Sequence, residues 1–144
     1  MEQLITFANN HPMLSAAWAA IVLMIVVISI RIKLSPIKQV SPQELTFLAN
    51  KNDGLVIDIR AEKDFKVSHI LDSVHFATDK ANNNDFASLE KHKDKPIIVV
   101  CTAGITASKV ANQFLKAGFN QVNLLKGGMN AWSAAGLPTA KSKK

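Results

Sequence analysis

Residues 96–106 read Pro-Ile-Ile-Val-Val-Cys-Thr-Ala-Gly-Ile-Thr, and this stretch decides the fold. Ile97–Val100 is a β-branched run without alternation of apolar and polar side chains, which is typical of a strand buried on both faces. The segment from Thr106 to Lys116 has the apolar spacing of a helix, and Gly118 is placed to end it. A buried strand, a short loop and a helix in this order predict a parallel α/β unit.

Strands and helices alternate on both sides of this unit. Ser41, Pro42 and Glu44 supply an N-cap, a proline at the first helical position and an acid at the third, so a helix is expected over about 42–50. Spacing and turn residues predict strands at 55–60, 73–76 and 121–125, helical segments at 61–67, 86–92 and 129–135, and a loop at 79–85. This alternation predicts an α/β fold with a largely parallel sheet and right-handed crossovers.

Cys101 is the one cysteine of the chain, and it follows the buried strand directly. In open parallel sheets, ligands bind beyond the carboxyl ends of the strands. A loop of this length can curl so that backbone N–H groups and the start of the next helix stabilise an anion at the sulfur. Gly104 supplies the backbone freedom for such a curl. An inert thiol at the end of a core strand is the alternative, and position alone leaves both open.

The N-terminal part of the chain contains a long uncharged stretch. From Pro12 to Ile30 there are 19 residues without Asp, Glu, Lys, Arg or His. As a helix this stretch reaches about 28 Å, close to the hydrocarbon thickness of a bilayer. A core helix would show a polar stripe, and a cleaved signal peptide would begin with basic residues. Neither feature is present, so a transmembrane helix in contact with the lipid bilayer is expected over residues 12–31.

Charge asymmetry around this span predicts its orientation. The basic residues Arg31, Lys33 and Lys38 all lie on its C-terminal side. Positive residues close to a span stay in the cytoplasm. We therefore expect a single-pass protein of the plasma (inner) membrane, with its N-terminus outside and its domain cytoplasmic. The expected divisions are a short N-terminal segment (1–11), the span (12–31), a basic linker (32–40), the domain (41–138) and a basic tail (139–144).

Small residues gather on the span at helical spacing, namely Ser15, Ala16, Ala19 and Ala20. Such residues let a second helix approach closely, which makes a membrane-protein partner a hypothesis. Alanine is also common in membrane helices that have no partner, and the sequence leaves this alternative open.

Composition excludes several classes of function. The formal net charge is +6, but the basic clusters of the linker and tail are not interleaved with aromatic residues. Nucleic-acid binding is therefore not expected. One cysteine rules out an intrachain disulfide and a cysteine-rich metal site.

Residues 55–132 resemble the rhodanese homology domain. The matching pieces, in chain order, are Val56-Ile57-Asp58-Ile59-Arg60, Asp64-Phe65, His69-Ile70, Pro96 to Cys101 with Gly104, Ala117-Gly118-Phe119, Val122, Leu125, Gly127-Gly128 and Trp132. With its N-terminal span, the chain looks like the membrane-anchored single-domain rhodanese proteins of the YibN type. The resemblance implies five parallel strands with helices on both faces.

The resemblance also implies an activity. Cys101 would be the catalytic residue, accepting a sulfane sulfur and passing it on as a persulfide to a thiol. The substrate-binding loop would be Thr102, Ala103, Gly104, Ile105 and Thr106. No metal or organic cofactor is implied, and the sequence names neither the sulfur donor nor the acceptor. The alternative is a non-catalytic interaction module that acts with a membrane-protein partner.

The loop departs from the family pattern Cys-Arg-x-Gly-x-Arg, because Thr102 and Thr106 occupy the two arginine positions. An arginine fork binds oxyanions such as thiosulfate, so weak thiosulfate activity is expected. Lys109 is either a partial substitute or an ordinary exposed lysine. A phosphatase would need an arginine at position 107, which is Ala107. His69 is expected to have a structural role. The same is expected of Asp58 and Arg60, at the end of the first predicted strand.

Overall fold

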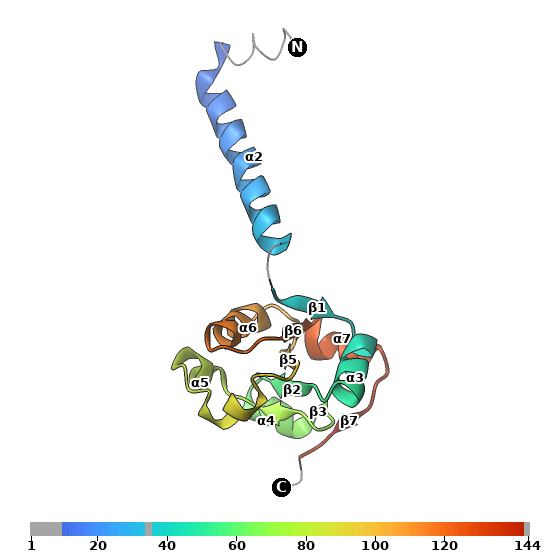
Figure 1. Ribbon diagram of the computed structural model, residues 1–144. Coiled ribbons are helices and arrows are strands. Elements are labelled where there is room, and N and C mark those ends of the chain that lie inside the picture. The colour runs from blue at the N-terminus through green and yellow to red at the C-terminus, as the bar shows by residue number, and fades with distance from the viewer. Residues whose placement is uncertain (1–9, 34–35, 143–144) are drawn as a thin grey trace. The chain divides into compact units, whose positions relative to one another are not determined.

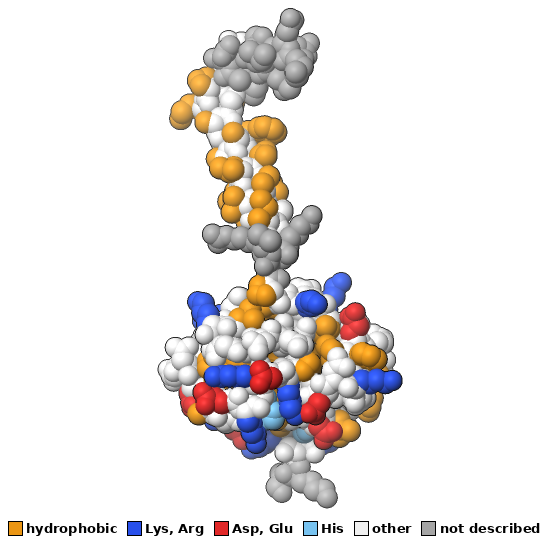
Figure 2. Space-filling model, viewed as in Figure 1, with side chains coloured by type: hydrophobic (Ala, Val, Ile, Leu, Met, Phe, Trp, Pro, Cys, Tyr) orange, Lys and Arg blue, Asp and Glu red, His pale blue; other side chains and the backbone are white. Residues whose placement is uncertain are grey.

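The computed structural model describes residues 10–33 and 36–142, and the chain divides into two compact units, residues 1–35 and 36–144. In the first unit, helix α2 (Pro12–Lys33) contains a stretch, Pro12–Ile30, that is long and apolar enough to cross a membrane. This stretch is not buried against other parts of the protein. Apolar side chains cover the described helix on the face seen in Figure 2. A core helix would be buried, so the exposed apolar surface fits contact with lipid.

The second unit contains a five-stranded parallel sheet with the strand order β1-β6-β5-β2-β4. The strands are β1 (Lys38–Val40), β2 (Leu55–Asp58), β4 (Val74–His75), β5 (Ile97–Val100) and β6 (Val122–Leu125). The expected α/β fold with five parallel strands is therefore confirmed. β5 lies at the centre, between β2 and β6, so the loop that follows it leaves from the middle of the carboxyl edge.

Helices cover both faces of the sheet (Figure 1). α3 (Pro42–Lys51) and α7 (Gly128–Ala134) pack on one face through Leu45, Met129 and Trp132. The other face is covered by α5 (Thr78–Asn82), the 3₁₀ helix η1 (Ala87–His92) and α6 (Ala107–Lys116). α4 (Glu62–Val67) follows β2. This arrangement separates two hydrophobic core clusters, one on each side of the sheet.

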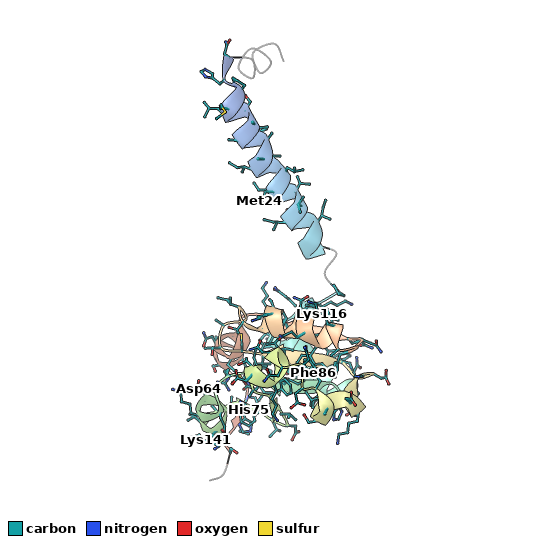
Figure 3. The ribbon with its side chains drawn as sticks, turned by 90° about the vertical axis from the view of Figure 1, so that its left-hand side faces the viewer. Met24, Asp64, His75, Phe86, Lys116 and Lys141 are labelled. Atoms are coloured by element: carbon teal, nitrogen blue, oxygen red, sulfur yellow. The ribbon has the colours of Figure 1, made fainter. Side chains whose placement is uncertain are left out.

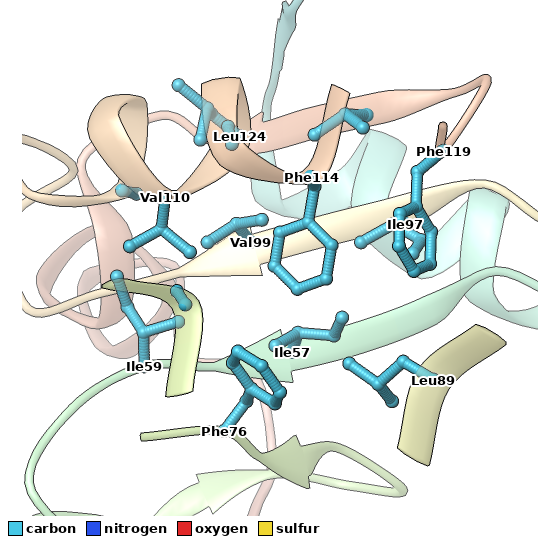
Figure 4. Packing of buried hydrophobic residues seen from close by; sticks show 14 of the residues in the cluster. Ile57, Ile59, Phe76, Leu89, Ile97, Val99, Val110, Phe114, Phe119 and Leu124 are labelled. Carbon is cyan, nitrogen blue, oxygen red and sulfur yellow. The ribbon is translucent and has the colours of Figure 1, made fainter. Parts of the chain in front are cut away.

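Strand β5 contributes to both clusters. Ile97 and Val99 point to the α6 side, whereas Ile98 and Val100 point to the α3 and α7 side, and all four are 0% exposed. The prediction of a strand buried on both faces is confirmed. On the α6 side, Phe114 lies over the sheet (Figure 4) with ring centroids 5.5 Å from Phe76, 4.9 Å from Phe86 and 5.0 Å from Phe119. This aromatic cluster fixes α6 and hence the end of the Cys101 loop.

The first helix of the domain begins as the sequence indicates. The Ser41 hydroxyl accepts the N–H of Glu44, and the Glu44 carboxylate accepts the N–H of Ser41, which completes a capping box. The hydrogen bond from the Ser41 backbone N–H, and after it the side-chain hydrogen bond with Ser41, hold the pKa of the Glu44 carboxyl below its usual range.

The structure differs from the expected elements at three places. Lys38–Val40, expected in the linker, is the edge strand β1, because Val40 buries its side chain while its neighbours pair with β6. Thr139–Ala140, expected in the tail, forms β7, which pairs antiparallel with β3 (His69–Ile70), a strand that the sequence did not predict. The expected loop at 79–85 instead includes most of α5, because burial of Ala81 favours a helical turn in a polar segment.

Candidate active site

Cys101 lies directly after the central strand β5, where the chain leaves the carboxyl edge of the sheet. Its side chain is buried, with 6% exposed. The backbone N–H of Gly104 donates a hydrogen bond to Cys101 Sγ, with an N–S distance of 2.9 Å. Gly104 has φ of +88°, a conformation in which a side chain would be strained. Of the backbone N–H groups that were expected to converge on the sulfur, that of Gly104 makes a hydrogen bond to Sγ in the structure.

The start of α7 holds the loop in place. The N–H of Met129 donates to the Cys101 carbonyl at 2.8 Å, and the N–H of Asn130 donates to the Thr102 carbonyl at 3.1 Å. A Cβ on Gly128 would lie 2.2 Å from the Cys101 carbonyl oxygen. Gly128 is therefore required because the backbone of α7 approaches the loop too closely for a side chain at this position.

A pocket of about 210 Å³ opens at the sulfur. It is lined by Ile59, Arg60, Cys101, Thr102, Ala103, Ile105 and Thr106. Four of the five predicted substrate-binding residues line the pocket, and the fifth, Gly104, contributes its N–H to the sulfur. Ile105 is 83% exposed, so an apolar side chain stands at the mouth. The loop residues named from the sequence therefore lie around the sulfur, and their binding of substrate stays a prediction.

Ile59 and Arg60 were not predicted to line a pocket. They follow β2, which pairs with β5 in parallel register from Leu55–Ile97 to Asp58–Val100. Parallel pairing brings the carboxyl ends of both strands together, so these residues lie beside Cys101. The sequence signal was a second apolar strand that ends in a charged residue, but strand order was needed to interpret it.

Among the described residues that line the pocket, Arg60 has the cationic side chain, and the Asp58 carboxylate neutralises its charge. Its Nε lies 3.0 Å from Asp58 Oδ1, and its Nη2 lies 2.7 Å from Asp58 Oδ2 and 2.5 Å from the Ser68 carbonyl. Asp58 is 1% exposed. Lys109 is exposed and does not line the pocket. The sulfur therefore faces a pocket without an unpaired positive charge among the described residues.

His69 does not line the Cys101 pocket. Its Nδ1 lies 2.7 Å from the Phe65 carbonyl, which requires Nδ1 to carry the proton. Its ring also stacks on Phe65 at a centroid distance of 4.1 Å. These contacts agree with the structural role expected for His69. The Asp58–Arg60 pair likewise holds the β2 end to the segment that contains Ser68.

A larger hollow of about 380 Å³ lies among α3, the β3 turn and the segment after α7. Its floor includes Leu45, Val56 and Trp132, and its rim carries the ion pair of Asp53 and Lys95. Cys101 does not line this hollow. We therefore place the candidate active site at Cys101 and not at the larger hollow.

The class of this protein is defined by a parallel sheet with helices on both faces and a cysteine in the loop after the central strand. The family model of the rhodanese-like domain matches residues 41–135. The chain belongs to the rhodanese-like domain family.

Individual relatives refine this assignment. The uncharacterised protein YibN of Escherichia coli (strain K12) is 38% identical over 143 residues, which is 99% of this chain and 100% of that protein. The thiosulfate sulfurtransferase GlpE of Coxiella burnetii is 32% identical over 107 residues, 74% of this chain and 96% of that protein. The crystal structure of the Alr3790 protein from Anabaena sp. has a TM-score of 0.63 at 26% identity, covering 71% of this chain and 81% of that chain. The chain is thus a YibN homologue whose domain is related to thiosulfate sulfurtransferases.

Proposed function

We propose that this protein is a membrane-tethered sulfurtransferase or persulfide carrier that moves sulfane sulfur through Cys101. The observation that carries the proposal is the hydrogen bond from the Gly104 N–H to Cys101 Sγ in an open pocket. A donor aimed at the sulfur stabilises a thiolate or a persulfide anion without a side-chain base. A structural thiol at the end of a core strand needs neither the donor nor the pocket.

The reaction is a double displacement. The Cys101 thiolate attacks the outer sulfur of a donor R–S–S⁻, the donor S–S bond breaks, and the thiolate R–S⁻ leaves. Cys101 then carries a persulfide, Cys–S–S⁻, and the Gly104 N–H remains on its inner sulfur, Sγ, where it stabilises the thiolate that attacks and is later restored. An acceptor thiolate attacks the outer sulfur, receives it as a new persulfide, and restores the Cys101 thiolate. Sulfur changes carriers, and no external oxidant or reductant is consumed.

The pocket favours donors without an oxyanion group. Thiosulfate carries a sulfonate that requires a cationic clamp, but Thr102 and Thr106 stand at the loop positions where family members have arginine. The Arg60 guanidinium is already held by Asp58. An apolar rim at Ile59 and Ile105 suits polysulfides and organic persulfides. We therefore assign such donors as the main substrates and thiosulfate as a weak one.

We further propose that α2 anchors the protein in the plasma (inner) membrane, with its N-terminus outside and the domain cytoplasmic. The support is the 19-residue apolar stretch Pro12–Ile30 and the basic residues that follow it. The small residues of α2 remain a candidate contact surface for another membrane helix, as the sequence indicates. Protease digestion of a C-terminal tag in intact spheroplasts and in inverted vesicles tests the orientation. Digestion in inverted vesicles alone is expected, and digestion in spheroplasts would contradict it.

The activity is tested by donor competition in the full chain. Purified protein is incubated with a polysulfide, with glutathione persulfide or with thiosulfate, and the sulfur that cyanide removes is measured. We expect loading from the first two and much slower loading from thiosulfate. If all donors fail while the thiol remains reactive, the non-catalytic interaction module becomes the better account. Replacing α2 by an unrelated apolar helix then tests whether the span is the functional part.

A further inference from the structure

The charges of the domain are separated along the chain. Ten of the chain's 11 acidic residues lie between Glu44 and Asp94, and residues 95–144 contain none. The same final part has seven lysines. The elements β5, α6, β6 and α7 are therefore free of acidic side chains. The earlier elements, from α3 to η1, contain acidic and basic residues mixed together.

Strand order gathers the acid-free elements in space. β1, which carries Lys38, lies at the sheet edge beside β6, and β6 contacts α6. Ile37 and Leu115, which precede Lys38 and Lys116, both pack against the same core cluster. Lys126 follows β6 directly, and its N–H donates to the Val40 carbonyl of β1. Lys38, Lys116 and Lys126 therefore lie at the same edge of the domain.

We name these three exposed lysines, Lys38, Lys116 and Lys126, the basic edge. The ion pairs of the described residues involve Arg60, Lys66, Lys93 and Lys95, and none of the basic edge. The acid closest along the chain is Glu44, whose carboxylate is engaged at the Ser41 cap. The charges of the basic edge are thus available to a partner.

The two ends of the domain differ in charge. Figure 1 shows α6 and β1 on one side of the domain and α4 on the opposite side. In Figure 3, Lys116 lies on the side where β1 begins, whereas Asp64 lies on the far side. α4 carries two exposed acids, Glu62 and Asp64, and two exposed lysines, Lys63 and Lys66, so its charges balance. The domain consequently has a positive end at β1 and α6.

The position of this end in the chain identifies its partner. α2 ends at Lys33 and β1 begins at Lys38. Five residues extend at most about 17 Å, so the basic edge stays close to any bilayer that α2 crosses. The cytoplasmic leaflet carries anionic lipids that attract basic groups within a Debye length, about 8–10 Å at physiological salt. A positive surface on so short a tether meets anionic headgroups at high local concentration.

We infer that the basic edge docks the domain on the anionic headgroups of the membrane in which α2 is anchored. The inference rests on the proposed membrane anchor and goes beyond the proposed sulfur transfer. The attraction multiplies the ratio of docked to free domain about fivefold for each lysine near the surface. No residue of the basic edge lines the Cys101 pocket.

The test uses the full chain in lipid nanodiscs. One set contains phosphatidylcholine alone, and the other contains about one third phosphatidylglycerol, which supplies the anionic headgroups. Acetylation of each lysine by a water-soluble ester is followed by mass spectrometry. In anionic discs, we expect at least about a fivefold decrease in the reactivity of Lys38, Lys116 and Lys126. Raising salt to about 1 M, where the Debye length is about 3 Å, should restore their reactivity.

Other lysines provide matched controls. Lys63, Lys80 and Lys91 are exposed on the part of the domain that also carries acids, and their reactivity should not change. Lys109 is exposed on the same helix as Lys116, so we expect anionic discs to lower its reactivity as well. It therefore reports docking in variants whose basic edge is itself replaced. The variant Lys38→Glu/Lys116→Glu/Lys126→Glu should lose the protection of Lys109, whereas Lys63→Glu/Lys80→Glu/Lys91→Glu should keep it. Circular dichroism of both variants verifies folding. Equal reactivity of the basic edge in both kinds of disc would overturn the inference.

The same samples separate this inference from the proposed function. Persulfide formation on Cys101 is measured in each kind of disc. If the lysines of the basic edge are protected but Cys101 takes up no sulfur, the docking inference stands and the proposed sulfur transfer fails. A chain that does not enter the discs lacks the anchor, and this result would overturn the docking as well.

Discussion

The backbone N–H of Gly104 points at Sγ of Cys101 across 2.9 Å. This contact distinguishes a thiol that is set up to carry charge from one that only fills a core. It depends on a loop whose carbonyls are held by the first N–H groups of α7, so the site is built by two segments that are far apart in sequence.

The first prediction concerns the close approach of α7 to the loop. In Gly128→Ala, the new Cβ would lie 2.2 Å from the Cys101 carbonyl oxygen, and φ is already +59°. We expect a loss of about 3 kcal/mol or more in the free energy of unfolding and a loss of sulfur loading. Urea titration in micelles, followed by the fluorescence of the buried Trp132, measures the stability.

The control for this prediction is Gly118→Ala. Gly118 also has a positive φ, +93°, but a Cβ added there would have no neighbour within 4 Å. Only backbone strain of about 1–2 kcal/mol should result, with sulfur loading retained. Equal effects of the two substitutions would show that contact with the loop is unimportant.

The second prediction concerns the neutral loop. Thr106→Arg places a guanidinium on the pocket wall, where it can bind the sulfonate of thiosulfate through two hydrogen bonds. We expect kcat/KM for thiosulfate to rise about tenfold or more, with little change for polysulfide. Thr106→Gln lengthens the side chain without adding charge and should not raise kcat/KM for thiosulfate. A similar rise in both variants would mean that charge does not limit thiosulfate use.

A third prediction addresses the buried ion pair. Asp58→Asn leaves Arg60, whose side chain is 10% exposed, without a neutralising charge. The free energy of unfolding should fall by about 3–5 kcal/mol, as for other broken buried pairs. By contrast, Lys93→Gln removes the partner of Glu90 from an exposed pair and should cost about 0–1 kcal/mol. Urea titration at neutral pH compares them, and equal costs would argue against a structural role for Asp58.

The fourth prediction is a pH dependence. The hydrogen bonds from Ser41 lower the pKa of Glu44 in the folded state. Its stabilising effect is therefore present above the unfolded pKa of about 4.3 and is lost as pH falls through the lower folded pKa. Wild type should be more stable than Glu44→Gln at neutral pH, and the difference should disappear in acid. Unfolding at a series of pH values checks this, and a difference independent of pH would contradict it.

Most of the fold follows from local patterns in the sequence. The β-branched run Ile97–Val100, the cap at Ser41 and the apolar face of α6 each predicted an element that the structure contains. Three strands, β1, β3 and β7, escaped prediction for a physical reason. They have only two or three residues each, and the pairing of β1 with β6 and of β3 with β7 depends on contacts distant in sequence. None of the three is long enough to show an alternating pattern of its own.

The candidate site was predictable only in part. Cys101 and the loop to Thr106 follow from the rule that parallel sheets bind at their carboxyl edge. Arg60 was expected to be structural, and its bonds to Asp58 and Ser68 agree, but its place on the pocket wall requires the order of the strands. The reason for Gly128 likewise appears only when α7 is seen against the loop.

The most direct test of sulfur transfer through Cys101 is the intact mass of the full chain in micelles after incubation with polysulfide. The account predicts a gain of one sulfur, about 32 Da, that cyanide removes and that is absent from Cys101→Ser. An unchanged mass in a folded protein whose Cys101 still reacts with a maleimide would contradict it.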